Sequence, residues 1–243
     1  MPPDEPPIAV SRPARTPIRD PHAIPVVGRD SHLPRVPPER LNPHALRERL
    51  AALQDWRPPI HGDGAAVEMA DRPATAASVL VPLIERPGGL HVLLTRRTDH
   101  LHDHAGQISF PGGRAEPSDA DAVATAMREA EEEVGLRPDA VEVLGQLPVY
   151  TTVTRFVVTP VLGLVRPDYV LTLDAFEVAE AFEVPLPFLM DPANHQHHEF
   201  EFGGARRRFL SMPWRPGHGD PREYFIWGAT AAMLRNFYHL LAD

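Results

Sequence analysis

The chain reads FPGGRAEPSDADAVATAMREAEEEVGL from residue 110 to residue 136, and this stretch decides the fold around it. Ser118 or Asp119 is a suitable N-cap and Gly135 a suitable C-cap, so the pattern predicts a helix over residues 122–134. Apolar residues recur at the helical period and define its buried face: Val123, Ala126, Met127, Ala130 and Val134.

Three glutamates share a neighbouring face of this predicted helix. Glu129, Glu132 and Glu133 stand at i, i+3 and i+4, while Glu131 points elsewhere. Like charges at this spacing destabilise a helix by roughly 0.2–0.5 kcal/mol per pair unless a cation neutralises them. Carboxylate oxygens suit Mg²⁺ or Mn²⁺. A bare acidic run is more often a solvated helix face, but the preceding glycine turn at residues 110–113 allows the close backbone approach that a phosphate site requires.

The same residues resemble the Nudix box, commonly written G-x5-E-x7-R-E-U-x-E-E-x-G-U, where U is a bulky aliphatic residue. Residues 128–136 match its second half, except that the small Ala130 takes the first aliphatic place. Counting from Gly113 puts Asp119 at the first acidic place, with one residue more than the general box before Arg128. That spacing is similar to a Nudix branch that hydrolyses coenzyme A.

The residues before the box also resemble that branch. Its signature, L-L-T-x-R-S-x3-R-x3-G-x3-F-P-G-G, corresponds to LLTRRTDHLHDHAGQISFPGG at residues 93–113. The two departures are Thr98 for Ser and His102 for Arg. Because an imidazole is charged only when protonated, a phosphate contact made by His102 weakens as the pH rises. We therefore expect His102→Arg to improve coenzyme A turnover more at pH 8 than at pH 6, values that bracket the ordinary histidine pKa of about 6.5.

The resemblance implies an α/β/α sandwich with a mixed sheet, which hydrolyses coenzyme A or an acyl-CoA to 3′,5′-ADP and 4′-phosphopantetheine. It implies that Glu129 and Glu133 bind Mg²⁺ or Mn²⁺, and that Glu132 is a further ligand or the water-activating base. Arg128 would orient a glutamate by a salt bridge. The implied substrate contacts are Arg96, Arg97, His102, Gly112 and Gly113, although a solvated strand end is an equal alternative for Arg96.

Two other functions stay open on the sequence. The first is a Nudix pyrophosphatase acting on ADP-ribose, NADH or another nucleoside diphosphate derivative. The second is a non-catalytic Nudix ligand-binding module, and the intact Glu129, Glu132 and Glu133 argue against it because loss of these carboxylates would be its simplest mark. The oligomeric state and the acyl-chain preference are not readable from the sequence.

Strand and helix patterns are mixed through residues 41–243 without an internal repeat, which predicts one α+β domain. The apolar runs 76–84 and 90–95 flank a Pro-Gly-Gly turn and predict a hairpin. Further strands are expected at 141–147, 156–165, 198–202 and 207–210, and further helices at 41–56, 176–182 and 226–241. Residues 1–40 are crowded with prolines and lack apolar periodicity, so they predict a disordered arm whose removal leaves turnover and thermal midpoint nearly unchanged.

The composition argues against several classes of binding partner. The formal net charge is −9, and nucleic acid or an anionic membrane would need clustered cations, so we expect neither; the expected partner is a small-molecule pyrophosphate. The absence of cysteine excludes disulfides and Cys-ligated zinc. No apolar run approaches the length of a bilayer and no secretory signal is evident, so we expect a cytoplasmic protein.

Three further clusters are weaker candidates for chemistry. His195, His197 and His198 have no partner ligands at zinc-site spacing and are predicted to form a polar loop that enters a strand. The arginines at 206–208 are predicted to form a solvated turn. One of Glu177, Glu180 and Glu183 is a candidate for a distal catalytic carboxylate, and the sequence does not choose between them.

Overall fold

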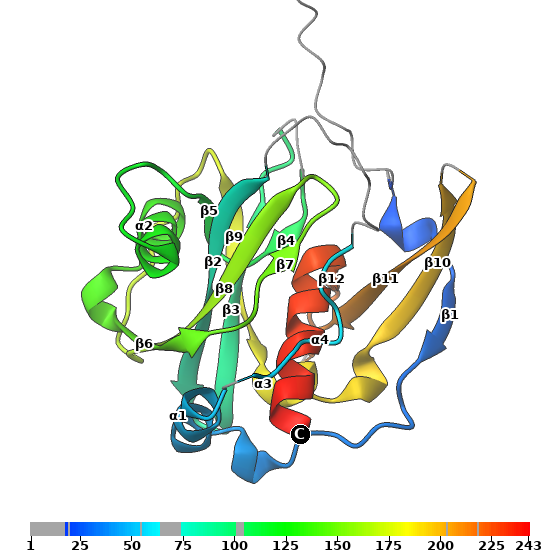
Figure 1. The fold of residues 1–243 in the computed structure, drawn as a ribbon, viewed down its shortest axis with the longest axis horizontal. Helices are drawn as coiled ribbons and strands as arrows, with labels where there is room; N and C mark the ends of the chain where they lie inside the picture. The colour runs from blue at the N-terminus through cyan, green and yellow to red at the C-terminus, as the bar shows by residue number, and fades with distance from the viewer. Residues whose placement is uncertain are drawn as a thin grey trace, which may run out of the picture.

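The structure, a computed structural model, describes residues 18, 20–53, 55–63, 74–100, 105–202, 204–217 and 219–243. Two sheets stand side by side with helix α4 (Gly228–Ala242) between them, and helix α2 (Ala122–Val134) covers the outer face of the larger sheet (Figure 1). The larger sheet thus lies between two helices, as the sequence predicts for an α+β sandwich. The other helices are α1 (Pro43–Ala51), α3 (Leu186–Leu189) and the 3-10 helices η1 (Pro21–Ala23), η2 (Pro38–Arg40), η3 (Pro138–Ala140) and η4 (Pro192–Asn194).

The larger sheet is mixed and has the order β4-β3-β2-β8-β6, with β5 on β2, β7 on β8 and β9 on β3. Its strands β2 and β3 form the predicted hairpin, with Arg86 opposite Gly89, while β2 and β8 run parallel. The eight strands are β2 (Thr75–Arg86), β3 (Gly89–Arg97), β4 (Ile108–Ser109), β5 (Gly112–Arg114), β6 (Val141–Gln146), β7 (Tyr150–Thr151), β8 (Phe156–Val165) and β9 (Val178–Pro185).

The apolar stripe of α2 explains how that helix is placed. Ala126, Ala130 and Val134 are fully buried and pack in one cluster with Leu80 and Leu93 of the sheet. Burial of each of the larger side chains, Val134, Leu80 and Leu93, stabilises the fold by roughly 1.5–3 kcal/mol, and the small alanines let the helix approach the sheet closely. The stripe fixes the rotation of the helix, and with it the direction of the glutamates on the neighbouring face.

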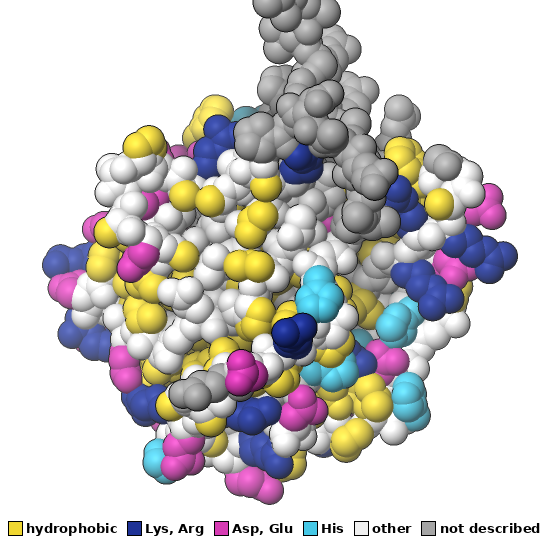
Figure 2. All heavy atoms as spheres, viewed as in Figure 1, with side chains coloured by type: hydrophobic (Ala, Val, Ile, Leu, Met, Phe, Trp, Pro, Cys, Tyr) yellow, Lys and Arg dark blue, Asp and Glu magenta, His cyan; other side chains and the backbone are white. Residues whose placement is uncertain are grey.

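The second sheet has the order β1-β10-β11-β12. Its strands are β1 (Val26–Arg29), β10 (Gln196–Phe202), β11 (Ala205–Trp214) and β12 (Tyr224–Trp227). The predicted arginine turn is wrong, because residues 206–208 lie within β11, where Arg208 donates to Glu199 at 3.0 Å. On the face shown in Figure 2, acidic and basic side chains are interspersed around the rim. Among the described helices, none has both the length and the apolar content needed to cross a bilayer.

Residues 20–40 are structured, so the disorder predicted for the first forty residues is wrong over this range. β1 pairs with β10, Val36 is only 3% exposed, and Arg40 donates to the Leu241 carbonyl at 2.8 Å. Strand pairing and backbone acceptors hold this segment, and neither interaction requires an apolar repeat in the sequence. Residues 1–17 and 19 lie outside the described part of the chain.

The helix predicted over residues 176–182 is also wrong. This segment leads into β9, which pairs with β3 from His91 to Arg97. The residue pattern of this segment suggested a helix, but neighbouring residues in it alternate between faces, with Phe182 facing one core and Ala181 the other. Pairing with a buried strand outweighs the weak helical preference of a short segment.

Candidate active site

The two ends of α2 are capped by local interactions. The N-cap is Asp121, whose carboxylate accepts a hydrogen bond from the Ala124 amide at 2.8 Å. The sequence prediction of Ser118 or Asp119 is therefore wrong by three or two residues. Gly135 ends the helix as predicted, in the left-handed conformation with φ 70°.

Asp119 instead binds Arg128, which joins the loop before the helix to the acidic face. The guanidinium donates to both oxygens of Asp119, to Glu129 and to Glu132, each at 3.0 Å. It also donates to the Arg114 carbonyl at 3.0 Å. The hydrogen bonds from Arg128 hold the pKa of Asp119 well below its usual range. Arg128 thus holds two of the predicted glutamates and the loop in one arrangement.

Glu133 is the most deeply buried carboxylate of α2, with 5% of its surface exposed. It accepts a hydrogen bond from the Gly112 amide at 3.2 Å and lies 3.5 Å from Nη1 of Arg97. Burial raises its pKa to about 7 in spite of these contacts, and the charges of Glu129 and Glu177 act in the same direction. A buried carboxylate with a raised pKa is stabilised in its ionised form when a further positive charge binds next to it.

Glu129 lies beside Gly113, one turn before Glu133. A Cβ atom on Gly113 would come within 2.6 Å of the Glu129 carboxyl group, so any larger residue at this position would displace that carboxyl group. Burial raises the pKa of Glu129, against the effect of its ion pair with Arg128. The glycine turn and the helix therefore bring two desolvated carboxylates against one stretch of backbone.

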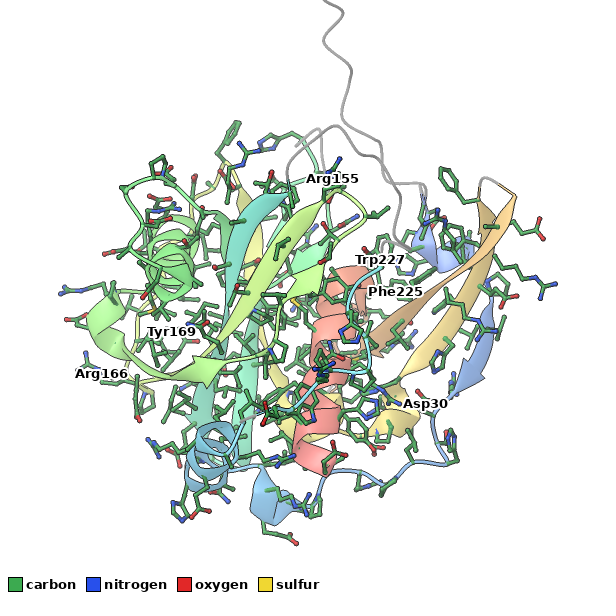
Figure 3. All side chains as sticks on the ribbon, in the orientation of Figure 1. Asp30, Arg155, Arg166, Tyr169, Phe225 and Trp227 are labelled. Atoms are coloured by element: carbon green, nitrogen blue, oxygen red, sulfur yellow. The ribbon has the colours of Figure 1, made fainter. Side chains whose placement is uncertain are left out.

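Glu177 is the functional candidate that the sequence left undecided. Its carboxylate lies 3.6 Å from Nη2 of Arg97, and its charge raises the pKa of Glu133 and Glu129. Glu183 is instead held by Arg86 at 2.6 Å and by the Tyr169 hydroxyl at 2.8 Å (Figure 3). Glu180 faces the second sheet, where Tyr224 donates to it at 2.6 Å. The pairing of β9 with β3 gives these three glutamates different partners, and the sequence did not predict this pairing.

Glu132 does not converge with its two neighbours. Its side chain is 61% exposed and turns to Arg128. Among the described residues, no three acidic or histidine side chains are arranged as a complete metal site. The donor set nevertheless fits a hard cation, because Glu129 and Glu133 offer carboxylate oxygens that are desolvated and incompletely neutralised.

The paired arginines at the end of β3 point to opposite faces of the sheet, as alternate residues of a strand do. Arg97 faces α2, where it lies near Glu133 and Glu177. Arg96 faces the second sheet and lies 3.6 Å from Glu180. The sequence therefore identified two cations, of which only Arg97 joins the glutamates. His102 lies outside the described residues.

The histidines at 195, 197 and 198 form hydrogen bonds within the fold. His195 is fully buried, and burial lowers its pKa to about 4. His197 contacts Asp30 at 2.7 Å, and His198 contacts the Ser211 hydroxyl at 2.8 Å. His195 directly precedes β10, whereas His197 and His198 lie within that strand, so the predicted polar loop is limited to the entry of the strand.

Comparison with known proteins identifies the family. The family model of the NUDIX domain matches residues 74–202. The chain is 44% identical over 161 residues to the Nudix hydrolase NudL of Escherichia coli K12. The aligned residues make up 65% of this chain and 79% of that relative. It is 43% identical over 161 residues, with the same coverage, to NudL of Shigella boydii serotype 4. A solved Ap4A hydrolase from C. elegans is 18% identical, with a TM-score of 0.40 over 49% of this chain and 85% of that chain.

The chain belongs to the Nudix hydrolase family. Nudix hydrolases cleave a pyrophosphate bond in nucleoside diphosphate derivatives, generally with a divalent metal ion. The matched range contains the glycine turn, α2 and Glu177, so the cluster described above coincides with the family's domain.

Proposed function

We propose that this Nudix hydrolase cleaves the pyrophosphate bond of coenzyme A or an acyl-CoA, giving 3′,5′-ADP and 4′-phosphopantetheine, with Mg²⁺ or Mn²⁺ as its cofactor. One observation supports this proposal above the others. Both ends of the coenzyme A-type signature meet the buried glutamate: Arg97 lies 3.5 Å from Glu133, and the Gly112 amide donates to it at 3.2 Å.

Glu129 and Glu133 would hold the metal ion, which, when bound, neutralises phosphate charge and activates a water molecule for attack at phosphorus. Arg128 keeps Glu129 turned toward Gly113, and the Gly112 amide fixes one oxygen of Glu133. Glu132 and Glu177 are the two candidates for the base that takes the proton from the water, because each is more exposed than Glu133.

Arg97 would bind the phosphate oxygens. Its contacts with Glu133 and Glu177 are 3.5 and 3.6 Å long, beyond good hydrogen-bond length, so its donors can turn to a stronger anionic partner. The net charge of the chain is −9, and local cations of this kind are therefore required for an anionic substrate to approach.

A product assay tests this function. Wild-type protein is incubated with coenzyme A and, separately, ADP-ribose, with Mg²⁺, with Mn²⁺ and with a chelator. We expect 3′,5′-ADP to form from coenzyme A in either metal, at least about tenfold faster per enzyme than ADP-ribose is cleaved, and no turnover with the chelator. Arg97→Gln should reduce kcat/KM by about tenfold or more, whereas Arg166→Gln, at an exposed site, should not. Faster cleavage of ADP-ribose than of coenzyme A would overturn the substrate assignment, while the protein would still be a pyrophosphate hydrolase.

A further inference from the structure

A cavity of about 530 Å³ lies on the opposite side of β3 from Glu129 and Glu133 of α2. Its wall includes Arg96, Gly106, Arg222, Phe225 and Trp227, together with His22 from η1. Phe225 and Trp227 lie at the gap between the two sheets, near the start of α4 (Figure 3). The cavity therefore forms only where the second sheet and the N-terminal segment meet the Nudix sheet.

Aromatic rings form one side of this cavity. Phe225 and Trp227 are alternate residues of β12, so their side chains share one face of that strand, and both are half-buried. His22 lies against Phe225 with ring centroids 4.2 Å apart, and Phe209 meets Trp227 edge-on at 5.4 Å. Rings held in this way offer flat surfaces on which a nucleobase can stack.

Two arginines form the other side, and they differ in how firmly they are held. Arg222 donates to Glu180 and to Asp220, each at 2.6 Å. Arg96 lies 3.6 Å from Glu180 and 3.8 Å from Asp99, and its side chain is 37% exposed. Contacts of that length are weak, so the Arg96 guanidinium is the group that a phosphate would engage.

The acidic residues of the wall do not prevent such binding, because each has a cation or amide partner. Glu223 lies 2.8 Å from Arg215, and Asp20 accepts from the His22 amide at 3.0 Å. Glu180 is shared by Arg222 and Tyr224, and burial with the Glu180 hydrogen bond raises the pKa of Tyr224 to about 12.

We propose that this cavity binds the adenosine 3′-phosphate end of the substrate, with the base stacked on Trp227 and the 3′-phosphate on Arg96. The inference rests on the proposed coenzyme A activity and deepens it. Arg96 and Arg97 are consecutive residues that serve opposite faces of one strand end, so the nucleotide and the pyrophosphate would be held on the two sides of that end.

Calorimetric titration of the full chain with 3′,5′-ADP, without metal, tests the proposal. We expect Trp227→Leu and Arg96→Gln each to raise the Kd by about tenfold or more. The matched variants Trp56→Leu and Arg166→Gln should leave it unchanged, because both residues lie outside the cavity wall. Wild-type protein should bind 5′-AMP about tenfold more weakly than 3′,5′-ADP, and Arg96→Gln should remove this difference. Trp227→Phe should retain most of the affinity, which separates stacking from a folding defect.

Unchanged affinity in both cavity variants would overturn the proposal, as would Trp227-dependent binding of 4′-phosphopantetheine in place of the nucleotide. The hydrolase assay separates this result from the proposed function. If coenzyme A is cleaved and the cavity variants bind normally, only the cavity assignment fails. If coenzyme A is not cleaved but 3′,5′-ADP binding needs Trp227 and Arg96, the nucleotide site stands and the coenzyme A activity fails.

Discussion

Two arginines on two helices, Arg128 on α2 and Arg235 on α4, each form ion pairs with acidic side chains. Arg128 is 21% exposed and contacts Asp119, Glu129 and Glu132. Arg235 is 7% exposed; it lies 3.0 Å from Asp30, which is labelled in Figure 3, and donates to Nδ1 of His195 at 2.9 Å. One cluster opens to solvent and the other is closed.

Charge balance separates the two clusters. Around α2, five carboxylates (Asp119, Glu129, Glu132, Glu133 and Glu177) share Arg97 and Arg128. Around Arg235, one aspartate faces one arginine and the ring of His197, and the buried His195 stays neutral at pH 7 because burial lowers its pKa to about 4. An excess of buried anion costs free energy until a cation binds, whereas a balanced buried pair needs no ligand. The cluster around α2 is therefore suited to binding a cation, whereas the cluster around Arg235 attaches residues 20–40 to the domain.

The largest effect on stability should come from breaking the balanced cluster. Arg235→Ala removes the arginine from Asp30, whose side chain is 13% exposed, and leaves it only the contact with His197, so we expect the free energy of unfolding to fall by about 3–5 kcal/mol. Urea denaturation measures this change. The exposed Arg166→Ala should change stability by less than about 0.5 kcal/mol. An equally small effect of Arg235→Ala would show that the cluster contributes little to holding the N-terminal segment.

Deletion of residues 1–40 removes Asp30 and β1 together. In contrast to the expectation from the sequence, we expect this deletion to lower the thermal midpoint. Differential scanning calorimetry provides the measurement, and an unchanged midpoint would mean that the contacts of residues 20–40 are energetically negligible.

In the unbalanced cluster, removal of one charge should abolish function and preserve the fold. We expect Glu133→Gln to lower kcat by about a hundredfold or more, because it removes a proposed metal ligand. Steady-state turnover on coenzyme A measures the effect. The exposed Glu131→Gln, on the same helix, is the matched control and should retain activity. Wild-type turnover by a folded Glu133→Gln protein would refute the metal-site assignment.

The balanced cluster should respond to acid through His195. Its pKa is lowered in the folded state to about 4, so its contribution to stability is complete above about pH 6.5 and is lost as the pH falls toward 4. Between pH 7 and pH 5 this amounts to about 2 kcal/mol. His195→Gln can keep both hydrogen bonds without titrating, so its stability should fall less over this range. Parallel curves for the two proteins would exclude His195 as the source.

The smallest effect concerns the unbalanced cluster without metal. The raised pKa of Glu133 means that its ionisation destabilises the folded state as the pH rises from about 4.5 to about 7, and the cost is complete above that range. At pH 8 with a chelator, Glu133→Gln should therefore raise the free energy of unfolding, and at pH 4.5 it should have much less effect. Adding Mg²⁺ should stabilise the wild-type protein and not the variant. Destabilisation of the variant at pH 8 would show that Arg97 and Gly112 already compensate the charge.

The sequence by itself determined the elements whose interactions are local. Helix α2 follows from its apolar stripe and Gly135, and the hairpin of β2 and β3 from its Pro-Gly-Gly turn. Arg128 meets Glu132 because residues four apart lie close together on a helix. The N-cap of α2 is the exception. Asp119 forms an ion pair with Arg128, and Asp121 caps the helix in its place.

Tertiary structure decided the features that depend on distant segments. Residues 178–182 pair with β3 and do not form a helix, and this pairing places the adjoining Glu177, but neither Glu180 nor Glu183, at Arg97. Asp30 meets Arg235 across most of the chain, and residues 20–40 are ordered by strand pairing that leaves no periodic trace in their sequence. Sequence periodicity reports which face of an element is buried, whereas the partner of that face, and the charges it brings, are set by the packing of the whole chain.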